Sequence, residues 1–267
     1  MRIVSLFAHN PRAWTGAGNH TYLLETSRPT LIDAGEGVPA HLDALAAATT
    51  GGALAQVLVT HAHPDHAAGV TAIAARWPGA DFAKLPWPEA DGRYGVPWRG
   101  LRDGDLVDAG GIGLLVLHTP GHSPDHVCFF EPDSGVLFGG DLVVNGGTVV
   151  IPATKGGNLR QYLQSLRAVL DLQPRRILPA HGAPIDNPGP LLRSYLAHRA
   201  MRERQVLEVL GDAPQTVDGL VGRLYPTLGS DLRGAAAESV LAHLVKLEEE
   251  GRAAREPGAD ITRWRRL

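Results

Sequence analysis

The stretch T-H-A-H-P-D-H, Thr60 to His66, decides how the rest of the chain is interpreted. It follows Gln56–Val59, an apolar run that predicts a short buried strand ending where the polar residues begin. Imidazole is the commonest protein ligand for zinc and related dications, and a carboxylate adds a harder oxygen ligand. On an extended chain His61 and His63 point to the same side, so both can reach one ion. The motif therefore predicts a metal site at a strand end.

The residues after Pro64 predict a helix from His66 to Trp77, with Asp65 and His66 at its N-terminus. Taken alone, Asp65 has a second interpretation as the cap of that helix. For the whole cluster a purely structural role is disfavoured, because packing gives no reason to place four adjacent polar residues at a strand end.

Length and composition indicate one large domain, or one domain with a small appendage. The net charge of -3 and the pI of about 6.4 give no global argument for nucleic acid or an anionic membrane. The single cysteine, Cys128, excludes an internal disulfide and is expected to be buried. Residues 1–8 contain no signal-peptide core, and no run of 18 apolar residues occurs. A soluble, cytoplasmic protein without membrane partners is expected.

The first third of the chain predicts strands and turns around one helix, at residues 38–50. Asp33 follows the third predicted strand, residues 30–32, and either orients a ligand histidine or serves as a turn residue. Residues 86–100 form a long Pro/Gly loop with three aromatic side chains. These aromatics could line a substrate pocket, although packing of the loop onto the core is favoured.

Further candidate ligands stand at the ends of other apolar strands. In L-V-L-H-T-P-G-H-S, Leu115 to Ser123, a strand ends and a sharp Pro-Gly turn presents His122. A predicted hairpin then ends at G-G-D, where glycines permit close backbone approach and Asp141 emerges. In I-L-P-A-H-G, residues 177–182, a strand again leads to a histidine, His181.

The motifs H-A-H-P-D-H, T-P-G-H-S, G-G-D and P-A-H-G, in this order, resemble the metallo-β-lactamase superfamily of binuclear hydrolases over about residues 1–190. The resemblance implies an α/β fold, a four-layer αβ/βα sandwich with metals at one edge. It implies that one ion is bound by His61, His63 and His122, that a second is bound by Asp65, His66 and His181, and that Asp141 bridges them. The flanking residues His118, Asp125 and His126 are expected to support the ligands or the fold.

This ligand set predicts hydrolysis by water activated between two ions. Two dications that share a hydroxide lower the pKa of water enough to give a nucleophile at neutral pH. Zn²⁺ is the expected ion, with Mn²⁺ and Fe²⁺ as alternatives. We further hypothesise that Asp65 is catalytic and handles the proton of the attacking water or the leaving group. Ser123 is better read as a turn residue than as a nucleophile.

The segment before His181 predicts a helix that Asn158 caps and that runs through Asp171. Lys155, just before it, could bind an anionic group of the substrate, although a solvated loop lysine is the more common case.

The composition changes after Pro188-Gly189-Pro190. Helices are predicted over residues 191–210, 216–224 and 231–250, followed by a two-stranded wing with turn signals at Pro257-Gly258. Three helices and a wing resemble a winged-helix module. We therefore predict a hydrolase domain over residues 1–190 and a winged-helix-like domain over residues 191–267.

The charge of this second domain argues against sequence-specific DNA binding. From Leu191 onward it has 12 Arg and Lys against 11 Asp and Glu, and its last helix ends in Glu248-Glu249-Glu250. The wing alone is basic. A lid, a packing element or a homodimer contact is therefore favoured over a DNA-reading role.

Over its whole length the chain is similar to the β-lactamase-like protein 2 subfamily, which implies metal-dependent endoribonuclease cleavage of single-stranded RNA. It also resembles the glyoxalase II group, which implies a small-molecule thioester or lactone substrate. A third hypothesis is a non-catalytic, metal-dependent nucleic-acid-binding regulator. The complete ligand set favours an enzyme. Antibiotic-hydrolysing members fit poorly, because a bridging Asp141 and the missing export signal point away from them.

Overall fold

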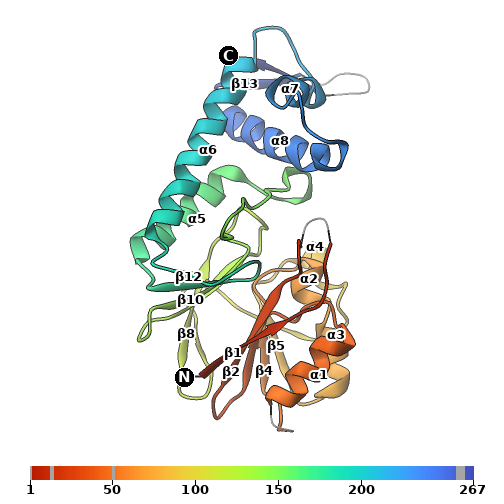
Figure 1. Cartoon of the computed structure of the whole chain (residues 1–267), viewed down its shortest axis with the longest axis vertical. Coiled ribbons are helices and arrows are strands. Elements are labelled where there is room, and N and C mark those ends of the chain that lie inside the picture. Colours follow the sequence, from red (N-terminus) through yellow and green to blue (C-terminus); the bar gives the residue numbers. More distant parts are fainter. Residues whose placement is uncertain (1, 13–14, 50–51, 257–261) are drawn as a thin grey trace. The chain divides into compact units, whose positions relative to one another are not determined.

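The computed structural model describes residues 2–12, 15–49, 52–256 and 262–267, and the chain divides into two compact units (Figure 1). The first unit comprises Met1–Thr119, Asp125–Thr148 and Val169–Pro188. The second comprises Pro120–Pro124, Val149–Ala168 and Gly189–Leu267. Both units thus contain residues from the middle of the chain.

The first unit contains two six-stranded sheets. The strands of the first sheet, in spatial order, are β1 (Arg2–Phe7), β2 (His20–Glu25), β3 (Thr30–Ile32), β4 (Gln56–Leu58), β5 (Asp81–Lys84) and β6 (Trp98–Gly100). β3 to β6 are parallel, whereas β1, β2 and β3 pair antiparallel. The carboxyl ends of parallel strands meet at one edge, so the residues that follow β3 and β4 lie together there.

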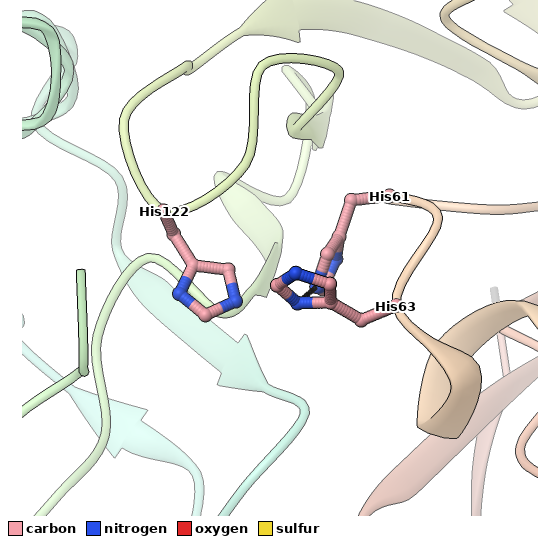
Figure 2. A group of neighbouring side chains, drawn as sticks. All are labelled: His61, His63 and His122. Atoms are coloured by element: carbon pink, nitrogen blue, oxygen red, sulfur yellow. Dashed lines mark hydrogen bonds between the residues drawn. The ribbon is translucent and has the colours of Figure 1, made fainter. Parts of the chain in front are cut away.

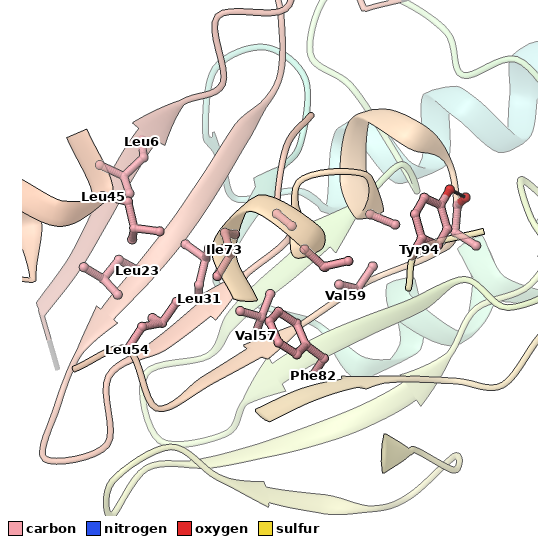
Figure 3. Packing of buried hydrophobic residues seen from close by; sticks show 14 of the residues in the cluster. Leu6, Leu23, Leu31, Leu45, Leu54, Val57, Val59, Ile73, Phe82 and Tyr94 are labelled. Atoms are coloured by element: carbon pink, nitrogen blue, oxygen red, sulfur yellow. Dashed lines mark hydrogen bonds between the residues drawn. The ribbon is translucent and has the colours of Figure 1, made fainter. Parts of the chain in front are cut away.

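Helices cover one face of the first sheet. The helices of this part are α1 (Pro39–Ala48), α2 (Pro64–Ala67), α3 (Val70–Arg76) and α4 (Pro88–Asp91). Leu45 of α1 and Ile73 of α3 belong to the same buried cluster as Leu23, Leu31 and Val57 of the strands (Figure 3). Each such fully buried side chain contributes about 1.5–3 kcal/mol of transfer free energy.

The second sheet packs against the other face of the first. Its spatial order is β12 (Ile185–Asp186), β11 (Arg176–Pro179), β10 (Val136–Gly140), β9 (Val127–Glu131), β8 (Gly113–His118) and β7 (Leu106–Asp108). Ile32 and Leu58 of the first sheet share a cluster with Phe129 and Phe138 of the second. The predicted α/β sandwich is confirmed. β10 and β11 are parallel, so the residues after them emerge side by side.

The second unit contains the C-terminal helices and the wing. Its elements are α5 (Leu159–Leu172, to Ala168 in this unit), α6 (Gly189–Val209), α7 (Val217–Leu224), α8 (Arg233–Glu249), β13 (Ala253–Glu256), β14 (Arg263–Arg266) and the short 3₁₀ helices Ala153–Lys155 and Ser230–Leu232. Leu220, Leu244 and Trp264 form its core. Thr216 accepts a hydrogen bond from the Gly219 amide, as expected of an N-cap. The predicted winged-helix module is confirmed, while the turn at Pro257-Gly258 lies outside the described residues.

Three local predictions differ from the structure. The predicted helix from His66 to Trp77 is broken into α2 and α3, because the His66 carbonyl accepts from the Ala34 amide and the Gly69 amide donates to the Gly35 carbonyl, instead of to helix partners. Gly69 lies so close to Ala34 that a Cβ would stand 2.1 Å from the Ala34 oxygen. The loop 86–100 is not irregular throughout, since α4 and β6 form within it. The predicted helix 231–250 begins with a 3₁₀ turn, so α8 starts two residues later. Among the described helices, none has the length and hydropathy needed to cross a bilayer.

Candidate metal centre

Strand ends bring the predicted ligands together. Asp33 follows β3, and the Thr60–His66 motif begins two residues after β4 in the same sheet. Asp141 follows β10, and His181 comes two residues after β11. All seven predicted ligands, His61, His63, Asp65, His66, His122, Asp141 and His181, occur in three groups whose ligand atoms lie within 4.8 Å of one another.

The first group consists of His61, His63 and His122 (Figure 2). The Nε2 of His61 lies 2.9 Å from the Nδ1 of His63. The Nδ1 of His122 lies 2.8 Å from the carbonyl oxygen of Val150. A carbonyl only accepts, so that Nδ1 carries a hydrogen and the Nε2 of His122 is left as the ligand atom. Three neutral imidazoles in this arrangement suit Zn²⁺ or a similar dication.

The second group has the spacing of ligands around one ion. The Nε2 of His66 lies 3.4 Å from both Asp65 Oδ2 and Asp141 Oδ1, and the Nε2 of His181 lies 3.3 Å from the same two oxygens. Good charge-assisted hydrogen bonds are shorter, about 2.7–2.9 Å. Tetrahedral ligands at 2.0–2.1 Å from an ion stand about 3.3 Å apart. Among the described residues, the buried Nε2 of His66 has no hydrogen-bond partner. These donors therefore fit a dication.

Asp141 lies within reach of histidines from both of the other groups. It forms a group with His61 and His66, and each of these also belongs to one of the other two groups. The Asp141 amide donates to the Nε2 of His126 at 3.0 Å, and the Nδ1 of His126 lies 2.9 Å from Thr119 Oγ1. His126 therefore helps to hold Asp141 in place through its backbone amide.

Asp33 plays both roles that the sequence left open. Its φ of 61° is a turn conformation. Its Oδ2 accepts a 2.8 Å hydrogen bond from the Nδ1 of His66, while its Oδ1 accepts one of the same length from the Thr60 amide. The carboxylate thus fixes the ring of His66 with Nε2 directed at the other donors.

Three carboxylates set the electrostatics of the second group. Burial alone lowers the pKa of His66, but Asp65, Asp141 and Asp33 outweigh it and raise the pKa well above its ordinary value. Burial raises the pKa of Asp65, yet His66 and His181 overcome that effect and hold it well below the usual range. Burial also lowers the pKa of His181, and Asp141 and Asp65 reverse that shift. These carboxylates and imidazoles therefore favour a positive charge between them, which protons or a dication can supply.

The loop aromatics pack onto the core, as favoured from the sequence. Tyr94 is buried, and its hydroxyl donates to the carbonyl of Ala62, which lies between two ligand histidines, at 2.5 Å. The Ala62 amide donates to Asp125 Oδ2 at 2.8 Å, and Lys84 pairs with the same oxygen. The contributions of Tyr94 and Lys84 were missed, because no motif surrounds either residue.

The remaining polar residues belong to none of the three ligand groups. His118 is exposed, and its amide donates to Asp103. Lys155 is exposed at the end of a 3₁₀ helix. Cys128 is fully buried, and burial raises the pKa of its thiol to about 12. His41 is completely buried in α1.

An α/β sandwich that gathers five histidines and two aspartates at its strand ends defines a metal-dependent hydrolase. The chain belongs to the metallo-beta-lactamase superfamily, whose family model matches residues 14–181. Residues 216–264 match the beta-lactamase associated winged helix domain.

Similar proteins match over nearly the whole chain. A beta-lactamase-like protein 2 homolog of Drosophila melanogaster is 33% identical over 97% of this chain and 91% of its own length. An atrochrysone carboxyl ACP thioesterase of Aspergillus chevalieri is 30% identical over 98% of this chain and 86% of its own. The crystal structure of a beta-lactamase domain protein from Burkholderia ambifaria superposes with a TM-score of 0.85 at 25% identity, covering 99% of this chain and 91% of that one.

Proposed function

We propose that this hydrolase uses two divalent ions to cleave phosphodiester bonds of single-stranded RNA. The observation that carries the hydrolytic part is the donor set, because Asp141 lies in reach of histidines from both ligand groups. His61, His63 and His122 would hold one ion, and Asp65, His66 and His181 the other. When bound, the ions would supply a water of lowered pKa and a Lewis acid for the phosphoryl oxygen.

Neighbouring groups of the protein fix the orientation of the ligand side chains. Asp33 and the Val150 carbonyl fix the rings of His66 and His122, so each presents Nε2. Asp65 is 12% exposed at its side chain and lies beside His181. It is the carboxylate that we assign to receive or return a proton during cleavage, as well as to bind an ion.

Two features support RNA as the substrate class. The similarity to the beta-lactamase-like protein 2 homolog spans 97% of the chain, winged helix included. The wing presents Arg263 and Arg266 as exposed side chains on β14. Arg255 and Arg265 are paired with Glu248 and Glu256, so part of the wing's positive charge is neutralised by ion pairs. Modest, salt-sensitive contact with a phosphate backbone suits this charge.

The test is cleavage of end-labelled single-stranded RNA, duplex RNA and single-stranded DNA by protein loaded with Zn²⁺ or Mn²⁺. We expect cleavage of single-stranded RNA that chelator abolishes and that His63→Ala and Asp141→Ala lose. Turnover of none of the three nucleic acids by metal-loaded protein would refute the RNA proposal. Full activity of either variant would refute the ligand assignment.

A thioester substrate is the second candidate. The atrochrysone carboxyl ACP thioesterase of Aspergillus chevalieri matches 98% of this chain. An acyl thioester and a lactone belong in the same assay as the RNAs. Thioester hydrolysis without RNA cleavage would move the assignment to this class. Salt-sensitive binding of duplex DNA without any turnover would instead favour a regulatory role.

A further inference from the structure

The peptide groups between His61 and His63 are held on both sides. The Ala62 amide donates to Asp125 Oδ2 at 2.8 Å, and the Ala62 carbonyl accepts from the Tyr94 hydroxyl at 2.5 Å. These two peptide planes join Ala62 to the neighbouring histidines. Their orientation therefore sets the directions in which both imidazoles leave the backbone.

Lys84, the last residue of β5, supports this arrangement from inside the protein. Its side chain is 0% exposed. Its Nζ lies 2.9 Å from Asp125 Oδ2, 2.6 Å from Asp91 Oδ1 and 2.5 Å from the Leu85 carbonyl oxygen. An ammonium has three hydrogens, and these three acceptors use all of them.

Asp91 is itself fixed by the start of α4. Its Oδ2 accepts a 2.8 Å hydrogen bond from the Trp87 amide. The Lys84 ammonium also lies 5.9 Å from the centre of the Trp98 ring, a favourable cation–π distance. The network therefore joins β5 and α4 to the Asp125 carboxylate, and hydrogen bonds fix the orientation of each charged side chain.

Stability alone does not explain why the Lys84–Asp125 ion pair is buried. A lysine is almost never fully buried unless it is paired, and a well-packed apolar group of similar volume is often equally or more stabilising than a buried ion pair. What an apolar group cannot provide is a directed acceptor for the Ala62 amide. The carboxylate of Asp125 provides it, and Lys84 holds that carboxylate in place.

We propose that Lys84 is a positioning residue for the metal centre. Through Asp125 it orients the Ala62 peptide, and thereby His61 and His63, towards a divalent cation. The proposal rests on the metal assignment of the proposed function and not on the substrate. Loss of Lys84 is expected to weaken metal binding by about 10- to 100-fold, the range found when groups that orient metal ligands are removed.

The test compares Lys84→Met, Asp125→Asn and the double variant with wild type in the full chain. Affinities for Zn²⁺ are measured by chelator competition, and Co²⁺-loaded proteins are compared by their visible absorption. Lys84→Met is expected to lose affinity and to change the Co²⁺ spectrum. The double variant is expected to recover part of both, because the asparagine side chain still accepts from the Ala62 amide and position 125 no longer carries a charge without its cation, whereas Asp91 loses its partner in both variants.

A matched control comes from the other unit. Lys246 is 9% exposed and pairs with Glu203 at 2.6 Å and Glu250 at 2.7 Å, so Lys246→Met also breaks a shielded lysine network. It is expected to lower stability and leave the Zn²⁺ affinity unchanged. If wild type itself binds no metal, the proposed function fails. If wild type binds and Lys84→Met binds equally tightly with the same Co²⁺ spectrum, the positioning role fails.

Should Lys84→Met not fold, Asp125 carries the test by itself. Asp125→Ala removes the acceptor for the Ala62 amide, whereas Asp125→Asn keeps it. We expect weaker Zn²⁺ binding and faster hydrogen exchange at the Ala62 amide in Asp125→Ala than in Asp125→Asn. Equal affinity in Asp125→Ala and wild type would overturn the proposal.

Discussion

Asp33 shows how much one side chain does at this centre. A single carboxylate shapes a turn through its φ of 61°, accepts the Thr60 amide and fixes the His66 ring. The Thr60 amide opens the ligand motif, and His66 closes it. Turn geometry and ligand orientation are therefore coupled at this residue.

Asp33→Asn is expected to weaken Zn²⁺ binding by about 10- to 100-fold with little change in fold. Asparagine keeps an acceptor for the Thr60 amide but presents a less basic group to His66. Chelator competition measures the affinity, and far-ultraviolet circular dichroism monitors the fold. An unchanged affinity would show that His66 is oriented by its packing alone.

His41 provides a test of stability against pH. Its imidazole is 0% exposed and lies 2.8 Å from Thr21 Oγ1, and burial, with His9, lowers its pKa from 6.5 to about 4. Between these pH values the unfolded chain binds a proton that the folded chain does not. The contribution of neutral His41 to the free energy of unfolding is therefore complete above pH 6.5. As the pH falls towards 4, this free energy decreases by up to about 3 kcal/mol.

His41→Gln should flatten this dependence, because glutamine can bond Thr21 without titrating. Urea unfolding of wild type and His41→Gln in the presence of a chelator, from pH 7 to pH 4, measures how the free energy of unfolding depends on pH. His243, whose pKa burial lowers to about 3, contributes equally to both curves. Parallel curves for the two proteins would contradict the assignment to His41.

The residues that sequence reasoning located are those with local signatures. His61, His63 and Asp65 share one motif, and glycine or proline marks the turns that present His122 and His181. Lys84 and Tyr94 act on the motif through partners far along the chain, Asp125 and Ala62, and they lie in no recognisable pattern. Whether a lysine is buried depends on which strands pack around it, and a single sequence does not reveal that packing.

At the scale of elements, contacts with a neighbouring loop determine where a helix stops. Apolar periodicity predicted one helix through residue 77, yet between α2 and α3 the Gly69 amide donates to the Gly35 carbonyl instead of continuing the helix. The Ala34 carbonyl occupies the space that a side chain would need. Periodicity describes which face is apolar and carries no information on a neighbouring backbone, so the break could not be predicted.

Gly69→Ala is expected to destabilise the protein by about 2–3 kcal/mol, because its Cβ would stand 2.1 Å from the Ala34 oxygen and 2.9 Å from the Gly37 nitrogen. Urea unfolding gives the change. Gly222→Ala in α7 is the control, since no atom lies within 4 Å of its Cβ position, and it should stabilise by about 0.5–1 kcal/mol. Similar effects of both substitutions would show that the backbone at Gly69 yields easily.

For the whole molecule, the motifs predicted the sandwich and the winged helix. They did not predict which segments from the middle of the chain belong to each of the two units. Pro120–Pro124, which contains His122, and Val149–Ala168 belong to the unit of the C-terminal helices. Arg199 of α6, 3% exposed, donates to the Val149 carbonyl, and the next carbonyl, of Val150, accepts from His122. Such pairings are long-range and have no sequence signature.

Arg199→Met is therefore expected to cost about 2 kcal/mol of stability and to weaken metal binding through His122. The comparison is Arg223→Met, because Arg223 is exposed and also donates to a backbone carbonyl, that of Val209, at 2.9 Å. Unfolding in urea and Zn²⁺ competition are measured on both variants. Equal Zn²⁺ affinities in the two variants would show that the Val149–Val150 backbone holds its place without Arg199.

The spacing of the second ligand group has a consequence for which ions the protein accepts. Donors 3.3–3.4 Å apart match an ion with bonds of about 2.0–2.1 Å. Ca²⁺ needs bonds of about 2.3–2.6 Å and more oxygen ligands, so it would have to push these buried side chains apart. The site thus selects ions by their radius. Excess Ca²⁺ should neither displace Zn²⁺ nor restore activity to the metal-free protein.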